Sequence, residues 1–381
     1  MKIEIFEMER MQSTWENLVE YDLSESGIMP VTLNNLVEMG LDMNELMDMP
    51  LGYSQSDGTL ELKDLLCKIY PGAKRENIEV TNGTSEANYI LALSQVKNGD
   101  DFALEIPNYM QLWGVPCSLG ANVKTFSLNV EDNWEPNWDE FEKAVNPNTR
   151  MVYISHPNNP TGSTLSDAAR ERIVKRCEEM DCYLLSDEVY LGAELEKERT
   201  KSFWGLSDKV IVTSGLSKAY GIPGVRIGWI IGPKEVVYDC WTQHDYITIG
   251  PNKSSDKIAR IAVKEENRDK LYNRTREVLQ KNIKIFREWV AEFGDFFTFK
   301  EPEAGAICFL KYKADIPSVE LCERILKNKS TLIVPGSHLG MEGYIRIWLG
   351  CSDEAKWREG LKRIKEEIEA IDPYRRKEVN L

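Results

Sequence analysis

Short apolar runs alternate with amphipathic segments between about residues 77 and 233. The runs are four to six residues long and rich in β-branched and aromatic side chains, as in buried strands. They are Ile78–Thr81, Phe102–Ile106, Val123–Leu128, Met151–Ser155, Tyr183–Ser186, Val210–Thr213 and Ile227–Ile231. Several of the segments between them have helical periodicity and begin with capping residues, for example at Thr84 and Ser166. This alternation predicts an α/β fold whose seven-stranded, mostly parallel sheet is covered by helices on both faces.

The pattern changes after residue 250. A long amphipathic stretch, Ser254–Phe293, precedes two short strand candidates and a charged helical segment; these are Ala306–Leu310, Tyr344–Leu349 and Asp353–Ala370. We therefore expect a large domain over residues 46–252 and a smaller α+β domain built from residues 1–45 and 253–381. The last residues, 372–381, are expected to form an exposed tail.

The composition of the chain disfavours several classes of binding partner. The 381 residues carry a net charge of −15, which disfavours nucleic acid and anionic membranes. No apolar run approaches the ~20 residues of a membrane span, and the glutamate-rich N-terminus is not a secretory signal. The eight cysteines are scattered singly, which indicates reduced thiols in a cytoplasmic protein. With three histidines in the chain we expect no metal site, although His156 and His244 remain candidate accessory groups.

Candidate chemistry follows the ends of the predicted strands, where open α/β sheets bind ligands. After the first strand, Thr84 and Ser85 open a helix, where free N–H groups suit a phosphate, although both residue types are also common N-caps. After the second strand comes Tyr109, either a flat lid over a ring-shaped ligand or a core residue. Asn159 lies in the tight turn P-N-N-P-T-G, which can direct its amide at a ligand.

Charged side chains follow the next strand ends. Asp187 ends a buried strand, where a carboxylate needs a cation or a donor, and Tyr190 lies three residues further on. Lys218 and Arg226 lie in a glycine-rich loop between two strands. A desolvated lysine near other cations has a lowered pKa and forms imines, whereas arginine recognises phosphate. An amine, a phosphate site, a carboxylate and an aromatic face together indicate pyridoxal 5′-phosphate.

These motifs resemble those of the fold type I pyridoxal-phosphate enzymes, specifically the class I/II aminotransferases, from about Tyr53 to the C-terminal helix. The resemblance implies an aspartate-aminotransferase-like fold and a Schiff base on Lys218. It also implies the following cofactor contacts: Thr84, Ser85, Ser217 and Arg226 at the phosphate, Asp187 at the pyridinium, Asn159 and Tyr190 at the 3′-oxygen, and Tyr109 on the ring.

The resemblance further implies a homodimer in which Tyr53 reaches the phosphate of the neighbouring subunit. Arg346, in Y-I-R-I-W-L-G, resembles the arginine that binds the substrate carboxylate. Two departures stand out. Gly215 occupies the position of a usual serine or threonine, with Ser214 one residue earlier, and Asp22–Ile28 replaces the usual substrate loop. Within that segment, Gly27 and Ile28 are expected to contact the substrate.

The leading interpretation is an aminotransferase acting on an L-amino acid and a 2-oxo acid. The alternative is a lyase or cyclase for an arginine-like amino acid, because the altered N-terminus is similar to that of capreomycidine-synthase-like enzymes. Glu25 and Asp245 are then candidates to face a cationic side chain. A non-catalytic ligand sensor and a nucleotide-binding dehydrogenase are weaker alternatives: the sensor has no need of Lys218 and Asp187, and the sequence lacks the dehydrogenase G-x-G-x-x-G.

Overall fold

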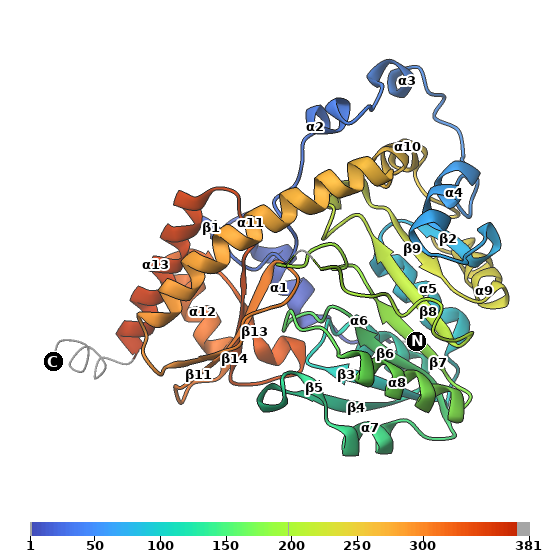
Figure 1. Ribbon diagram of the computed structural model, residues 1–381. Helices are drawn as coiled ribbons and strands as arrows, with labels where there is room; N and C mark the ends of the chain where they lie inside the picture. The colour runs from blue at the N-terminus through green and yellow to red at the C-terminus, as the bar shows by residue number, and fades with distance from the viewer. Residues whose placement is uncertain (1, 197, 372–381) are drawn as a thin grey trace.

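The computed structural model describes residues 2–196 and 198–371, and its largest element is an eight-stranded sheet (Figure 1). Its order is β2-β9-β8-β7-β6-β3-β4-β5. The strands are β2 (Ile78–Thr81), β3 (Asp101–Ile106), β4 (Asn122–Asn129), β5 (Glu135–Pro136), β6 (Thr149–Ser155), β7 (Tyr183–Asp187), β8 (Val210–Gly215) and β9 (Gly228–Ile231). Neighbours from β8 to β4 pair in parallel, whereas β9 and β5 pair antiparallel. The predicted mostly parallel sheet is confirmed, with the two-residue β5 as an eighth strand.

Alternate residues of each central strand face opposite helical layers, which explains why these strands are apolar throughout. Leu184 and Val152 belong to one core cluster, and their neighbours Leu185 and Tyr153 belong to another. One face is covered by α5 (Thr84–Gln95), α6 (Gln111–Leu119) and α9 (Lys234–His244). The other is covered by helices that include α4 (Leu60–Ile69), α7 (Trp138–Ala144) and α8 (Asp167–Glu179).

A separate antiparallel sheet of order β10-β11-β14-β13 is built by the C-terminal part of the chain. Its strands are β10 (Phe297–Phe299), β11 (Ile307–Tyr312), β13 (Val334–Pro335) and β14 (Tyr344–Trp348), and the helices of this part are α12 (Ser318–Lys329) and α13 (Glu354–Ile371). The long amphipathic stretch is two helices, α10 (Lys253–Ala262) and α11 (Glu265–Ala291). Figure 1 shows α11 running from the larger sheet to the smaller one. The predicted tail lies outside the described residues.

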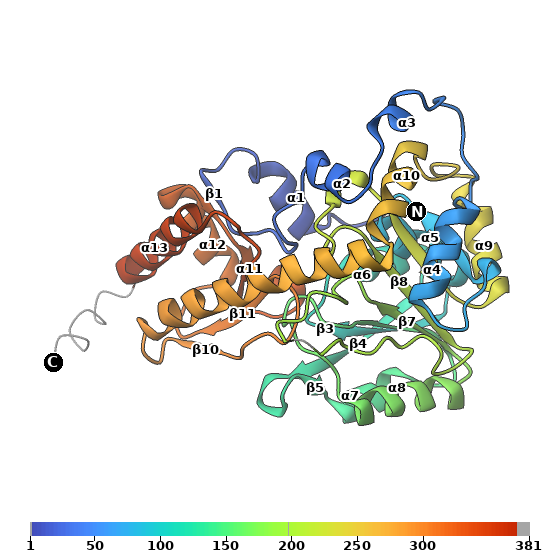
Figure 2. The same cartoon turned by 45° about the horizontal axis from the view of Figure 1, so that its top comes forward.

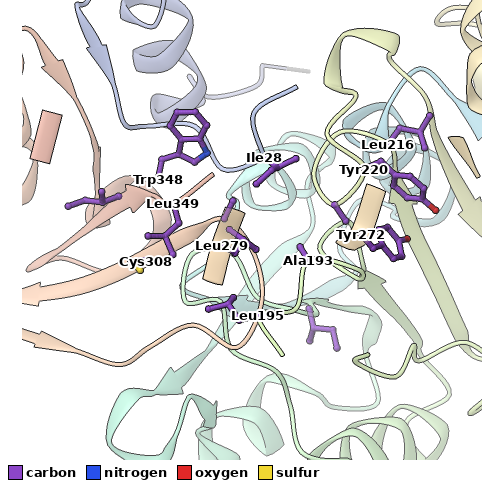
Figure 3. Packing of buried hydrophobic residues seen from close by; sticks show 14 of the residues in the cluster. Ile28, Ala193, Leu195, Leu216, Tyr220, Tyr272, Leu279, Cys308, Trp348 and Leu349 are labelled. Atoms are coloured by element: carbon purple, nitrogen blue, oxygen red, sulfur yellow. The ribbon is translucent and has the colours of Figure 1, made fainter. Parts of the chain in front are cut away.

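One continuous hydrophobic cluster joins the two sheets (Figure 3). Leu216 and Tyr220 lie near the larger sheet, Leu279 lies on α11, and Cys308 and Leu349 lie in the C-terminal part.

The N-terminal segment crosses to both parts of the molecule. Residues of β1 (Tyr21–Asp22) pair in parallel with β12 (Thr331–Leu332). Met8 of α1 (Glu7–Trp15) packs with Leu128 and Trp134 from the larger part and with Phe309 from the smaller. Figure 2 shows α1 where the two parts meet. The short helices α2 (Leu33–Glu38) and α3 (Met43–Met47) then lead to α4. No described helix is both long enough and apolar enough to cross a membrane.

Candidate active site

A cavity of about 300 Å³ opens at the carboxyl ends of β6 and β7, beside the first turn of α5. Its walls include ten side chains that the sequence singled out: Glu25, Thr84, Ser85, Tyr109, Asn159, Asp187, Tyr190, Ser217, Lys218 and Arg226. They converge because parallel strands end at one edge of the sheet.

The amine of Lys218 lies 3.7 Å from Oε1 of Glu25. Burial lowers the pKa of Lys218, but Glu25 and Tyr190 raise it, and the net shift is upward. The expected lowering of this pKa was therefore wrong for the protein without a ligand, because sequence spacing did not reveal that a carboxylate stands beside the amine. Glu25 is held in turn by the backbone N–H groups of Ser26 and Gly27, at 3.0 and 3.2 Å.

The carboxylate of Asp187 is buried at the end of β7, where burial raises its pKa to about 6. Asn88 donates to it at 2.9 Å, and the backbone N–H of Val189 donates at 3.2 Å. Thr213 donates to the amide oxygen of Asn88 at 2.8 Å, which fixes the amide so that its NH₂ faces Asp187. Sequence reasoning missed Asn88, although it lies four residues after Thr84 and therefore on the same face of α5.

Gly83, Thr84 and Arg226 form one end of the cavity. Thr84 begins α5, and its buried hydroxyl has no hydrogen-bond partner among the described residues. Gly83, at φ +94°, leaves the space that the guanidinium of Arg226 occupies; a Cβ there would overlap it. Arg226 reaches this position from a left-handed backbone, at φ +52°. The end of the cavity therefore combines a helix N-terminus, a free hydroxyl and an arginine.

The departure at Gly215 has a steric reason. A Cβ at this position would lie 2.6 Å from Oγ1 of Thr84 and 2.8 Å from the carbonyl oxygen of Ile227. Thr84 thus takes the space that a larger residue at 215 needs. Ser214 donates instead to the carbonyl oxygen of Glu188, at 3.1 Å, and Ser217 accepts from Arg226 at 3.5 Å.

Asn159, Tyr190 and Tyr109 line the walls around Lys218. The buried hydroxyl of Tyr190 has no hydrogen-bond partner in the described part of the chain. Tyr109 donates to Glu9 at 2.7 Å. The turn that carries Asn159 is supported by Glu105, whose Oε1 accepts from Ser155 N and Asn158 Nδ2 at 3.1 and 2.8 Å. Burial raises the pKa of Glu105 to about 8.

Arg346 lies in β14 behind the cavity and is 1% exposed. Its guanidinium donates to Oδ1 of Asn159 at 3.0 Å and to the carbonyl oxygen of Ser24 at 2.6 Å. The thioether of Met8 lies 3.7 Å from Nη1. Burial lowers the pKa of Arg346. Within residues 2–196 and 198–371, its Nε has no hydrogen-bond partner and its guanidinium makes no ion pair. A buried guanidinium without an anion indicates a site for one.

Four expected residues, Gly27, Ile28, Tyr53 and Asp245, are not part of the cavity walls. A Cβ on Gly27 would approach Cδ of Lys218 to 3.3 Å, so Gly27 packs directly behind the lysine stem. Ile28 is a buried core residue of the cluster that joins the two sheets, as Figure 3 shows. Tyr53 is 89% exposed in the single chain. Asp245 is also exposed and is not part of the cavity.

The two candidate histidines have different surroundings. His156 is fully buried, and burial lowers its pKa to about 3, so it is a neutral core residue at the edge of Phe203. His244 contacts Glu79 at 2.8 Å and Glu86 at 3.2 Å. Burial disfavours its charged form, but the two carboxylates outweigh burial and raise its pKa to about 9. Glu86 also accepts the backbone N–H of Asn82 at 2.5 Å, which ties this cluster to the turn before α5.

Helix α1 supplies one wall that sequence reasoning missed. Its cavity residues are Met8, Glu9, Gln12, Ser13 and, just after its last turn, Glu16. Their spacing of three or four places them on one face of the helix, a pattern that was visible in the sequence. Within the described ranges, no cluster of three or more histidine, cysteine, aspartate or glutamate side chains is arranged to hold a metal ion.

Comparison with known proteins agrees with this geometry. The profile of the family described as aminotransferase class I and II matches residues 18–364. Capreomycidine synthase of Streptomyces vinaceus is 27% identical over 351 residues, 91% of this chain and 89% of that protein. Aspartate aminotransferase of Pyrococcus horikoshii is 26% identical over 336 residues, 83% of each protein.

A similar solved structure is that of a pyridoxal-phosphate-dependent aminotransferase from Streptococcus suis. It has a TM-score of 0.90 and 29% identity, over 98% of this chain and 99% of that one. The fold, the cavity and the family profile lead to one conclusion: the chain belongs to the class I and II aminotransferases, whose cofactor is pyridoxal 5′-phosphate.

Proposed function

We propose that this enzyme transfers the amino group of an L-amino acid to a 2-oxo acid, with the cofactor aldehyde linked covalently to Nζ of Lys218. The observation that carries the proposal is the meeting, at one cavity, of the Lys218 amine and the Asp187 carboxylate, with the unpaired guanidinium of Arg346 behind it. An amine, an acid for a ring nitrogen and a carboxylate receptor are what amino transfer requires.

The cavity residues fit the cofactor group by group. Thr84, Ser85, Ser217 and Arg226 would hold its phosphate, and Tyr109 would cover its ring. The unpartnered hydroxyl of Thr84 would donate to a phosphate oxygen, and that of Tyr190, with the amide of Asn159, would bind the 3′-oxygen. Two buried hydroxyls that lack partners in the described chain would thus both acquire one.

The chain's own residues have distinct tasks. When bound, the cofactor supplies a ring that withdraws electrons from the substrate Cα. With the cofactor bound, Asp187 would hold a negative charge beside the ring nitrogen and keep that nitrogen protonated, and the cationic ring would in turn favour the ionised form of Asp187. Arg346 fixes the substrate carboxylate, so that the Cα proton faces Lys218. Nζ of Lys218, once free and neutral, would remove that proton as general base and deliver it, as general acid, to the cofactor carbon that takes up the amino group.

A lyase or cyclase reaction is the second candidate, because a relative at 27% identity is a capreomycidine synthase. It shares the binding groups and the removal of the Cα proton, and differs in the bonds that break afterwards. Incubation with each amino acid and 2-oxoglutarate separates the two: formation of glutamate supports amino transfer, whereas loss of a side-chain group or a cyclic product without glutamate supports the alternative.

We further propose that the enzyme is a homodimer, with Tyr53 reaching the phosphate of the neighbouring subunit. Leu51, Tyr53 and Tyr246 are 92%, 89% and 88% exposed, which is unusual for apolar side chains of a monomer unless another chain covers them. The division into residues 46–252 and residues 1–45 with 253–381 stays a proposal, supported by the pairing of β1 with β12. A cytoplasmic location is proposed from the unpaired cysteines.

Borohydride reduction tests the proposal. The purified holoenzyme should gain a stable cofactor adduct whose peptide contains Lys218, and Lys218→Ala should lose both the adduct and amino transfer. Lys175→Ala is the control, since the Lys175 side chain is 76% exposed and remote from the cavity. An adduct that persists in Lys218→Ala would overturn the assignment.

A further inference from the structure

Three glutamates, Glu9, Glu16 and Glu25, line the active-site cavity. Glu9 and Glu16 are seven residues apart, two turns of helix, and so face the cavity from the same side of α1. Glu25 reaches the cavity from the loop that follows β1. Arg226 and the first turn of α5, the proposed phosphate site, form another part of the wall.

The cavity has more of these carboxylates than basic side chains that are free to neutralise them. Lys218 and Arg226 are the basic side chains that line the cavity in the described structure, and both are committed to the cofactor in the proposed function. When Nζ of Lys218 takes part in the reaction, it is no longer a free ammonium group that can neutralise Glu25. Glu9 and Glu16 make no ion pair within the described ranges; they accept from Tyr109 and Asn17. Burial raises the pKa of Glu16, and the charges of Asp22, Glu25 and Glu9 raise it further.

A second, independent observation orients the ligand. Arg346 is 1% exposed with an unpartnered Nε, which makes it the receptor for a carboxylate. Met8, 3.7 Å from this guanidinium, directly precedes Glu9 in α1. Tyr190, also buried with an unpartnered hydroxyl, lies in the same wall as Glu25 and Lys218. The carboxylate end of an amino acid bound to Arg346 would therefore lie next to α1, whose glutamates line the same cavity.

We infer that the side chain of the substrate amino acid ends in a guanidinium or ammonium group, bound by Glu9, Glu16 and Glu25. The inference rests on the proposed function and names the substrate class of the same site. It differs from what the aspartate aminotransferase relatives suggest, because a second substrate carboxylate would meet three glutamates and no uncommitted cation among the described lining residues. A cationic substrate group would form charge-assisted hydrogen bonds with these glutamates, as an arginine does with a carboxylate in a protein interior.

Paired substrates test the inference. L-Citrulline has nearly the shape of L-arginine but carries an uncharged ureido group. The holoenzyme should bind L-arginine or L-lysine at least ~30-fold more tightly than L-citrulline or L-norleucine, measured by the change in cofactor absorbance, and should bind L-aspartate more weakly than any of these. Equal binding of arginine and citrulline, or a preference for aspartate, overturns the inference.

Substitution then assigns the effect to the acids. Glu16→Gln should lower the affinity for the preferred basic amino acid by ~10-fold and leave that for L-citrulline unchanged. Glu171→Gln, at an exposed position of α8 outside the cavity, is the matched control and should change neither. A loss with both ligands indicates damage to the cavity and counts against the inference.

The binding readout separates this inference from the proposed function. Selective binding of the basic amino acid without glutamate formation sustains the inference and overturns amino transfer. Amino transfer from neutral or acidic amino acids in preference to basic ones sustains the proposed function and overturns the inference.

Discussion

Arg346 and Asn159 are hydrogen-bonded across 187 residues of sequence, with Nη1 of the arginine 3.0 Å from Oδ1 of the asparagine. The bond joins β14 of the smaller sheet to the turn that follows β6 of the larger one. In the proposed function Asn159 contacts the cofactor and Arg346 the substrate, so the bond couples the two binding sites directly.

Replacing Arg346 by lysine should raise KM for the amino acid by on the order of 100-fold, because an ammonium cannot bind a carboxylate and Asn159 with the same planar geometry. Steady-state kinetics at saturating 2-oxo acid measure the change. Arg75→Lys is the control: Arg75 pairs with Asp64 on the surface, 50% exposed, and its replacement should leave KM unchanged. An unchanged KM in Arg346→Lys would remove Arg346 from the substrate site.

Asp187 predicts a pH-dependent stability of the cofactor-free protein. Its pKa is about 6, raised by burial from an ordinary value of 3.8, so between pH 4 and 6 the folded chain holds a proton that the unfolded chain has lost. Stability should therefore fall as pH rises through this window, by up to about 3 kcal/mol from this group. Asp187→Asn should remove that decrease and make the cofactor-free protein more stable at pH 7, as urea unfolding at pH 4.5 and pH 7 would show.

The same variant should behave differently with cofactor. A neutral amide at position 187 cannot hold the ring nitrogen protonated, so kcat should fall by ~100-fold or more while the cofactor stays covalently bound. In the unfolding experiment, the comparison of Asp187→Asn with wild type at each pH cancels the contributions of Glu105 and Glu188 to stability, because their pKa values are raised in both proteins. A variant with normal kcat would contradict the role of Asp187.

Gly83→Ala should weaken cofactor binding at least ~10-fold, because the new methyl group would displace the guanidinium of Arg226. Gly72→Ala is a matched control. Gly72 has a similar φ, +84° against +94°, but no described atom within 4 Å of the added Cβ. Both variants should lose about 1 kcal/mol of stability through backbone strain. Titration of cofactor-free protein with pyridoxal phosphate should separate them, and equal affinities would contradict the proposed phosphate site.

The raised pKa of His244 predicts that the protein loses stability in mildly alkaline solution. Its folded pKa of about 9 exceeds the ordinary 6.5, so its stabilising charge is fully present below pH 6.5 and is lost as pH rises towards 9. This group contributes up to about 3 kcal/mol to the decrease. His244→Gln should be less stable than wild type at pH 6 and should show a smaller decrease between pH 6.5 and 9, measured by urea unfolding. An identical decrease in the variant would mean that other groups cause it.

Residues at strand ends were predictable because two local signals agreed there. Asp187 and Lys218 each follow an apolar run, and a charge in that position needs a partner or a function. The family resemblance then matched these positions one by one. The strand assignments of the larger sheet, apart from β5, came from hydrophobic pattern alone, since buried parallel strands have an unbroken apolar signal.

Residues placed by tertiary packing were not predictable in the same way. Glu9 and Glu16 lie on a helix whose face was visible in the sequence, but nothing local indicated that this face meets Lys218. The predicted pKa of Lys218 was wrong for the same reason, because Glu25 is brought to it by a loop that is distant in the chain. Ile28 was expected at the substrate and lies in the core, in the same hydrophobic cluster as Leu216.

The pairing of Tyr21 and Asp22 with Thr331 and Leu332 has a consequence for the order of biosynthesis. The ribosome synthesises the N-terminal glutamates first, whereas β12, the strand that pairs with β1, follows about 310 residues later in the chain. The loop with Lys218 and Arg226 is complete well before that. During translation the loop with the proposed prosthetic-group ligands is therefore synthesised before the strand that fixes the segment preceding Glu25.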